Sequence, residues 1–177
     1  MKIRLSLLVK IVGVAVLLVA LATVFVFSYG REQSWELLAG PPDLGAADLG
    51  TLSRRSWSND ALMCRDSFCP AALVDLPGSI YKINAMDLAV ALDDAVVGED
   101  HLRRVDDGLD PLYRRFVQRT PGLRFPDTID VRFFPLSEDR SYMAVYSRSQ
   151  MGYGDFGVNR ERIQRWAGYL DYVPHDN

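Results

Sequence analysis

The chain has 177 residues, of which 20 are basic and 23 acidic, so its formal net charge at pH 7 is −3. Hydrophobic residues make up 49% of the chain and charged residues 24%, which is ordinary for a globular domain and excludes wholesale disorder. The acidic balance argues against a nucleic-acid partner, because such proteins carry a basic surface. Two cysteines are too few for a disulfide-rich miniprotein, and the length allows one domain of typical size.

An apolar segment near the N-terminus is the first element. Residues 11–29 contain no charged side chain. At about 1.5 Å rise per residue, a helix over this segment matches the roughly 30 Å hydrocarbon core of a bilayer. Lys2, Arg4 and Lys10 precede the segment, and Arg31 follows it. This excess of positive charge on the N-terminal side predicts a cytoplasmic N-terminus.

Two other interpretations of this segment are a cleaved signal peptide and a buried core helix. Residues 20–22 match an A-x-A cleavage site, but residues 23–27 stay apolar, which a cleavage region should not. A charge-free run of this length is also unusual in a soluble core. We therefore expect residues 1–30 to form a cytoplasmic N-terminal region and one transmembrane helix, with Tyr29 and Trp35 as interfacial anchors. The remainder then lies in the periplasm, outside a bacterial inner membrane.

Residues 31–59 are predicted to form an extended tether. Gly-Pro-Pro at 40–42 and a further glycine at Gly45 interrupt any periodic pattern. Trp57 is expected to contact the folded domain, the membrane or a partner, and Trp35 the membrane or a partner. The tether would thus join the membrane helix to a separate outer domain.

Cys64 and Cys69 are the only cysteines. In an oxidising compartment a short-loop disulfide is the default for such a pair. A redox-active pair is the alternative, although the spacing is not C-x-x-C. A zinc site needs more ligands than two thiols, and His101 and His175 are remote in sequence. We expect a disulfide, no metal and no cofactor.

The folded domain is predicted over residues 60–173, with a short tail at 174–177. Strand-like stretches are expected at 79–83, 101–106, 112–120, 128–136 and 141–149, and helices at 85–97 and 158–170. Short connections between consecutive strands imply an antiparallel sheet of about five strands with both helices on one face. The fold class is therefore a two-layer α+β domain preceded by one transmembrane helix.

Residue periodicity predicts the core-facing side chains. In the strand at 128–136, alternation places Ile129, Val131 and Phe133 on one face. Each helix is expected to turn one apolar face toward the core. In the helix at 85–97 this face consists of Met86, Leu88, Ala89, Val90, Leu92, Ala95 and Val96, and in the helix at 158–170 it consists of Val158, Ile163, Trp166 and Leu170.

Residues 152–157 read G-x-G-x-x-G between a strand and a helix, as in a dinucleotide-binding fingerprint. Too little sequence follows Gly157 for the second parallel strand and ribose-binding acid that such a site needs. A tight turn is the simpler interpretation, with Asp155 or Asn159 capping the last helix.

The same turn is the candidate binding site. A helix N-terminus attracts negative charge, and Arg148, Arg160 and Arg162 lie near it in sequence. With Asp155 and Asn159 they form a candidate site for a carboxylate, a phosphate or an acidic residue of a partner. In the competing interpretation, these arginines pair with internal acids at 127, 130 or 155 and lock the turn.

Residues 146–163, YSRSQMGYGDFGVNRERI, resemble the signature of the DUF1499 family, roughly R-S-x-S-R-x-G-x-S-D-x-G-V-N-R-x-R. The Phe-Pro-Asp step at 125–127 and the cysteine pair are similar to other parts of the family pattern. Gln150 and Gly154 stand where the family often has Arg and Ser, and the Pro-Asn before the second family cysteine is absent. The resemblance implies a bacterial or plastid protein, often secreted or anchored, and supplies no catalytic residue.

The sequence contains no G-x-S-x-G, H-x-x-x-H or H-E-x-x-H pattern, so we assign no catalytic residue and expect no enzymatic activity. The favoured hypothesis is an anchored periplasmic interaction protein. It would be an accessory subunit or assembly factor of a larger inner-membrane complex, for example respiratory or photosynthetic. Its partners would be membrane lipid and that complex. The alternative is a periplasmic domain that binds or acts on an anionic small ligand at the Gly-rich turn.

Overall fold

The computed structural model describes residues 2–54, 57, 59–65, 67–70 and 73–176. The first residue of the expected membrane region and the last of the expected tail lie outside this part. The chain divides into two compact units, residues 1–40 and 41–177, and each is described by itself.

The first unit consists of two helices, α1 (Lys2–Tyr29) and α2 (Arg31–Ala39). The segment Leu7–Tyr29 of α1 is long and apolar enough to cross a membrane, and none of it is buried within the unit. Gly30 separates the helices with a φ of 106°, a conformation that L side chains rarely adopt. The expected extended tether is thus helical over its first nine residues, since no helix breaker occurs before Gly40 and Pro41.

The second unit is built on an antiparallel sheet with strand order β3-β4-β5-β6-β2-β7, in which β1 pairs with the other half of β6. The strands are β1 (Asp60–Met63), β2 (Ile80–Tyr81), β3 (Leu102–Arg104), β4 (Tyr113–Arg119), β5 (Pro126–Pro135), β6 (Ser141–Ser149) and β7 (His175–Asp176). The α+β class is confirmed, but over the described residues the sheet has seven strands rather than about five. The expected tail contributes β7, which pairs with β2.

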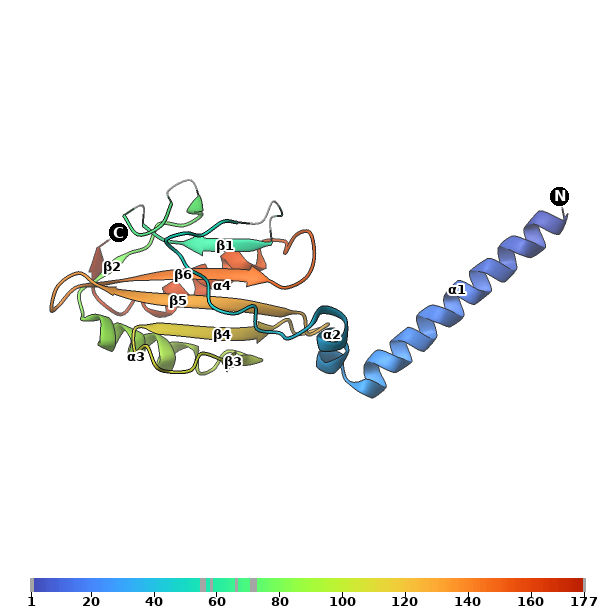
Figure 1. Ribbon diagram of the computed structural model, residues 1–177, viewed down its shortest axis with the longest axis horizontal. Helices are drawn as coiled ribbons and strands as arrows, with labels where there is room; N and C mark the ends of the chain where they lie inside the picture. Colours follow the sequence, from blue (N-terminus) through green and yellow to red (C-terminus); the bar gives the residue numbers. More distant parts are fainter. Residues whose placement is uncertain (1, 55–56, 58, 66, 71–72, 177) are drawn as a thin grey trace. The chain divides into compact units, whose positions relative to one another are not determined.

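Helices α3 (Ala85–Val96) and α4 (Val158–Tyr169) cover one face of the sheet (Figure 1). The predicted alternation is confirmed, because the core between these layers contains Ile129, Val131, Phe133, Met143 and Val145. Trp166 is fully buried there and meets the edge of Phe116. Three predicted inward positions are wrong: Met86, Val90 and Val158 are exposed at the helix surfaces.

The opposite face of the sheet is covered by non-helical segments of the chain. The dark teal segment that starts at Pro41 crosses this face in Figure 1. The backbone N–H of Leu44 donates to Thr128 Oγ1 at 3.0 Å, and that of Ala47 donates to Asp130 Oδ1 at 3.1 Å. The rest of the expected tether is therefore fastened to the sheet where the structure describes it.

A smaller apolar cluster fills this second face. It contains Leu49, Leu62, Cys64, Cys69, Tyr142, Ala144 and Tyr146. Phe68, inside the loop that the two cysteines close, stacks on Phe134 and Tyr142. The sheet is thus buried on both faces along β6, where residues 141–147 are all buried.

Candidate functional site

The Gly-rich turn between β6 and α4 depends on two glycines with positive φ, Gly152 at 93° and Gly157 at 86°. Asp155 closes the turn. Its Oδ1 accepts a hydrogen bond from the N–H of Gly157 at 3.0 Å, and its Oδ2 accepts one from the N–H of Asn159 at 2.9 Å. The predicted capping role of Asp155 is confirmed, and it satisfies N–H groups that a helix N-terminus leaves free.

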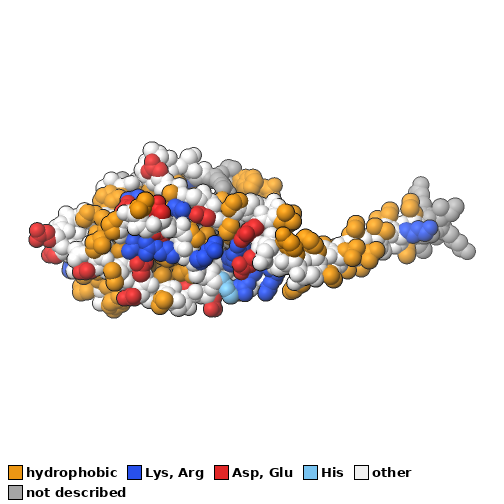
Figure 2. Space-filling view, turned by 60° about the horizontal axis from the view of Figure 1, so that its bottom comes forward, with side chains coloured by type: hydrophobic (Ala, Val, Ile, Leu, Met, Phe, Trp, Pro, Cys, Tyr) orange, Lys and Arg blue, Asp and Glu red, His pale blue; other side chains and the backbone are white. Residues whose placement is uncertain are grey.

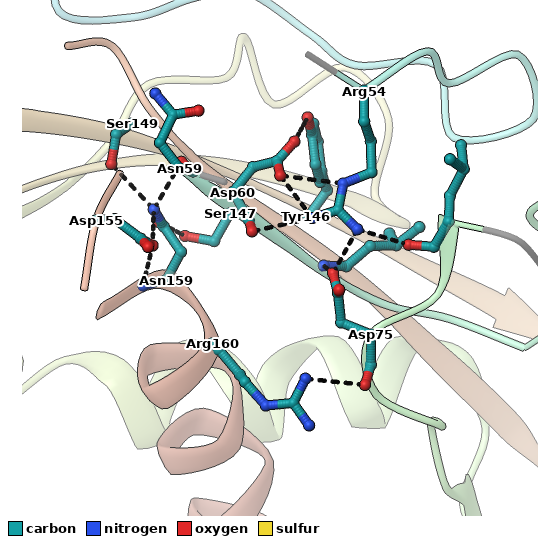
Figure 3. A network of polar contacts seen from close by, with 12 residues as sticks. Arg54, Asn59, Asp60, Asp75, Tyr146, Ser147, Ser149, Asp155, Asn159 and Arg160 are labelled. Carbon is teal, nitrogen blue, oxygen red and sulfur yellow. Dashed lines mark hydrogen bonds and ion pairs between the residues drawn. The ribbon is translucent and has the colours of Figure 1, made fainter. Parts of the chain in front are cut away.

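Asn159 does not cap the helix, because it lies inside α4 and is fully buried. Its Nδ2 donates toward Ser149 Oγ at 3.0 Å and the carbonyl oxygen of Asn59 at 3.0 Å. Its Oδ1 accepts from Ser147 Oγ at 2.6 Å. Figure 3 shows Asn159 pointing from α4 toward the end of β6. It therefore ties the helix to the sheet and to the residue before β1.

Arg162 lies one turn further along α4 and is also buried. Its Nη2 is 2.6 Å from Asp127 Oδ2, and its Nε donates to Gln118 Oε1 at 2.6 Å. Its Nη1 donates to Ser147 Oγ at 2.8 Å and to Asn159 Oδ1 at 2.6 Å. The guanidinium is thus engaged by side chains from β4, β5 and β6, as a buried charge requires.

Arg148 occupies the other face of the sheet. Its Nη1 is 3.3 Å from Asp130 Oδ2, and its Nη2 donates to the carbonyl oxygen of Gly45 at 2.6 Å. Burial raises the pKa of Asp130, while the hydrogen bond from the Tyr113 hydroxyl and the charge of Arg148 oppose that rise. Arg148 therefore helps to hold the segment after Pro41 on the sheet.

Arg160 is exposed, and its Nη1 donates to the backbone carbonyl of Asp75 at 3.0 Å. Beside it lies an open groove of about 430 Å³, lined by Arg54, Asp60, Ala61, Asp75, Arg160 and residues 154–157. Arg54 bridges two of the three acids that line this groove, with Nη2 2.6 Å from Asp60 Oδ1 and Nη1 2.7 Å from Asp75 Oδ2 (Figure 3).

The five residues of the predicted site are therefore not one cluster. Asp155, Asn159 and Arg162 belong to a network at the start of α4, whereas Arg148 lies on the opposite sheet face and Arg160 faces solvent. Arg162 and Arg148 pair with Asp127 and Asp130, as the competing interpretation of the sequence expected.

Several residues of the network and of the neighbouring groove had no signal in the sequence. Asn59, Asp75 and Gln118 are remote from the motif along the chain, and ordinary polar residues near a strand end indicate no role by themselves. Asn59 is buried, and its Nδ2 donates to the carbonyl oxygen of Gly152 at 2.8 Å. It thus supports the Gly-rich turn from the residue before β1.

The outward side of the turn is aromatic. Phe156 is fully exposed and has a φ of 55°, which is rare for a bulky side chain. Tyr153 is exposed and lies against Trp57, with the ring centroids 4.3 Å apart. Of the predicted membrane or partner contacts, Trp57 thus joins the turn. Tyr29 belongs to the other unit, where it stacks on Phe25.

The predicted disulfide between Cys64 and Cys69 is present, and both residues are buried. His175 hydrogen bonds through Nδ1 to the carbonyl of Val173, at the β7 edge. Within the described residues, no group of three or more His, Cys, Asp or Glu side chains is placed to hold a metal ion.

Together these features define a two-layer α+β domain behind an apolar helix, with a motif-bearing turn locked by a buried polar network. The profile of the family described as "Protein of unknown function (DUF1499)" matches residues 81–170. The match covers half of the chain and runs from β2 to the end of α4, so the chain belongs to the DUF1499 family. The cysteine pair and Asn59 lie outside the matched residues. No curated protein matches the chain.

Proposed function

We propose that this protein is a single-pass, membrane-anchored interaction protein. It serves as an accessory subunit or assembly factor of a larger inner-membrane complex, for which respiratory and photosynthetic complexes are examples. Helix α1 spans the membrane and contacts the partner there. The domain at 41–177 lies in the periplasm.

The single observation that carries this proposal is that two arginines of the motif form ion pairs inside the domain. Arg162 and Arg148 each face a carboxylate inside the domain. A free anionic ligand would have to displace Asp127 or Asp130 from these pairs, at the cost of leaving a buried carboxylate without its cation. The network instead stabilises one shape of the turn, which supports a structural role for the motif in a domain presented by a membrane helix.

Two features of different origin support the proposed compartment. A buried disulfide between Cys64 and Cys69 suits an oxidising environment. The basic residues before the apolar segment, Lys2, Arg4 and Lys10, favour the cytoplasm for that side of the membrane. Both features support a domain on the far side of a bacterial inner membrane.

A second candidate function rests on the groove beside Arg160. Among the residues that the structure describes, this exposed guanidinium makes one hydrogen bond, to the carbonyl of Asp75, and it lies at the start of α4. In this alternative an anionic small ligand binds, or is acted on, in that groove. Titration with inorganic phosphate and with dicarboxylates should then raise the thermal unfolding temperature of the chain but not of Arg160→Met. No shift in the unmodified chain would contradict this alternative.

The test of the main proposal is affinity purification of the full chain after mild detergent extraction from native membranes, followed by mass spectrometry. Helix packing in membranes favours small residues at the contact. Gly13 and Ala20 lie seven residues apart on α1 and so share a face. We expect one membrane complex to co-purify with the unmodified chain and to be depleted by Gly13→Leu with Ala20→Leu.

The matched control is Val12→Leu with Val19→Leu, which adds methylene groups about 100° round the same helix. This pair should leave co-purification unchanged. Equal recovery of the complex with both double variants would remove α1 as the contact, and recovery of the protein alone in every case would contradict the accessory-subunit role.

A further inference from the structure

The two ends of the antiparallel sheet differ in charge. At one end, the loops at 105–112 and 136–140 carry five acidic residues: Asp106, Asp107, Asp110, Glu138 and Asp139. At the other end lie the loops at 120–125 and 150–157, which are neighbours because the N–H of Gln150 donates to the carbonyl of Pro126 at 3.1 Å. We call these two loops, with Trp57, the tip.

The only acidic residue of the tip is Asp155, and its carboxylate is turned inward onto Gly157 and Asn159. A third loop at this end, at 97–101, carries the exposed Asp100 beside β3. Of the three loops, only the two of the tip therefore have no carboxylate turned toward solvent. Figure 2 shows hydrophobic side chains gathered at the upper right of the folded unit and acidic side chains at its left-hand end.

The tip exposes large apolar side chains from both of its loops. Phe156 is fully exposed, Tyr153 is 79% exposed, and Leu123 is 57% exposed. Phe156 is held in a left-handed backbone conformation by a turn that Asp155 and Asn59 fasten from the inside. A fully exposed ring makes no packing contacts that could offset the conformational energy of its strained backbone. Such strain indicates a function for the exposed ring.

The chain enters the second unit near the tip. The side chain of Gln150 donates to the carbonyl of Pro41 at 2.7 Å. Only residues 30–40 separate Pro41 from the end of α1, and nine of them form α2, which rises about 1.5 Å per residue. The chain that joins the candidate membrane span to Pro41 is therefore short. The ten-residue strand β5 places the acidic loop at 136–140 roughly 30 Å away from the tip.

We propose that the tip is a lipid-binding surface that rests on the membrane interface, where Phe156, Tyr153 and Leu123 enter the boundary between headgroups and acyl chains. Aromatic rings are enriched at this depth, and an exposed carboxylate would oppose it. The acidic end then points to water. The proposal rests on the membrane anchoring of the proposed function but not on its partner complex.

The test uses the full chain in lipid nanodiscs of phosphatidylcholine and phosphatidylglycerol, with no other protein except the scaffold. A nitroxide is attached to Leu123→Cys, and collision rates with oxygen and with a water-soluble nickel chelate report its depth. Labelling is selective because Cys64 and Cys69 are bonded and buried. The matched control is Leu109→Cys, which is 85% exposed in the loop before β4, whereas residue 123 follows that strand.

We expect the oxygen-to-nickel ratio at position 123 to be several-fold higher than at position 109. Adding Phe156→Ser, a fully exposed substitution, should lower the ratio at position 123 toward the value of the control. Equal, water-like ratios at 123 and 109 would overturn the proposal. A label at 123 that is shielded from both probes would also overturn it, because that result indicates a protein contact. Loss of the partner complex in the co-purification experiment would not affect this measurement.

Discussion

Arg162 of α4 and Asp127 of β5 form a buried ion pair, with Nη2 2.6 Å from Oδ2 and side chains that are 4% and 3% exposed. The pair joins the helical layer to the sheet at the motif that the chain shares with its family. Removing one partner of such a pair leaves the other charge buried without compensation, so the pair is a structural requirement of the domain.

Arg162→Met should therefore lower the free energy of unfolding by about 3–5 kcal/mol, because Asp127 is left buried and unpaired. Denaturant unfolding of the full chain in detergent, followed by near-ultraviolet circular dichroism, measures this change. Arg160→Met is the matched control on the same helix. Its guanidinium is exposed and donates to the carbonyl oxygen of Asp75, so we expect a loss of about 1 kcal/mol or less. Equal losses of unfolding free energy for the two variants would contradict a larger structural role for the buried pair.

Asp155→Ala should destabilise the start of α4 and free the Gly-rich turn. The carboxylate accepts hydrogen bonds from the N–H groups of Gly157 and Asn159, and loss of such a cap costs about 0.5–2 kcal/mol. Hydrogen exchange at those two amides should accelerate. Asp94→Ala, on the exposed side of α3, is the control and should leave exchange at the turn unchanged. Unchanged protection of the two amides in Asp155→Ala would contradict the capping role.

We expect Glu99 to make the stability of the domain sensitive to acid. Burial alone would raise the pKa of Glu99, but hydrogen bonds from Arg165, Gln118 and Tyr169 outweigh it and lower the pKa to about 2. A depressed pKa contributes stability above the unfolded value of 4.5, and this contribution is lost as pH falls toward 2.

The variant Glu99→Gln isolates this effect. The unfolding midpoint of the unmodified chain should exceed that of the variant most clearly above pH 4.5, and the gap should shrink as pH falls toward 2. Because Gln118 also accepts a hydrogen bond from Arg162, the loss should reach the buried network. A difference that does not change between pH 6 and pH 2 would contradict this prediction.

We expect removal of the disulfide to cost less stability than removal of Arg162 from the buried ion pair. Cys64 and Cys69 are five residues apart, and closing so short a loop is worth about 2 kcal/mol in a chain-entropy treatment. Cys64→Ala with Cys69→Ala should lower the free energy of unfolding by that amount and leave the fold intact. A reductant should destabilise the unmodified chain and have no effect on the double variant. Complete unfolding on reduction would show that the disulfide, rather than the network, holds the domain together.

Much of the fold was predictable because it follows strong periodicity. The alternation of Ile129, Val131 and Phe133 identified the core face of β5, and the turn residues bounded β5 and β6. Strands β1 and β7 have four and two residues, too few to show alternation. Their formation depends on pairing with β6 and β2, which are remote in sequence.

The candidate site was predicted only in part, and for a geometric reason. Arg148 and Arg162 are close in sequence, but alternate residues of a strand face opposite sides of the sheet. Ser147 of β6 therefore faces Arg162, whereas Arg148 faces Asp130. Arg148 therefore lies on the sheet face that α3 and α4 do not cover. No local pattern points to Asn59 or Gln118, because tertiary folding alone brings them to the network.

The central claim, that this is an anchored subunit of a larger membrane assembly, is tested most directly by the mass of the particle that contains it. The tagged full chain, extracted from native membranes in mild detergent, should run in native mass spectrometry as part of one large complex of fixed stoichiometry. A species of 19.9 kDa with only detergent or lipid bound would contradict the claim.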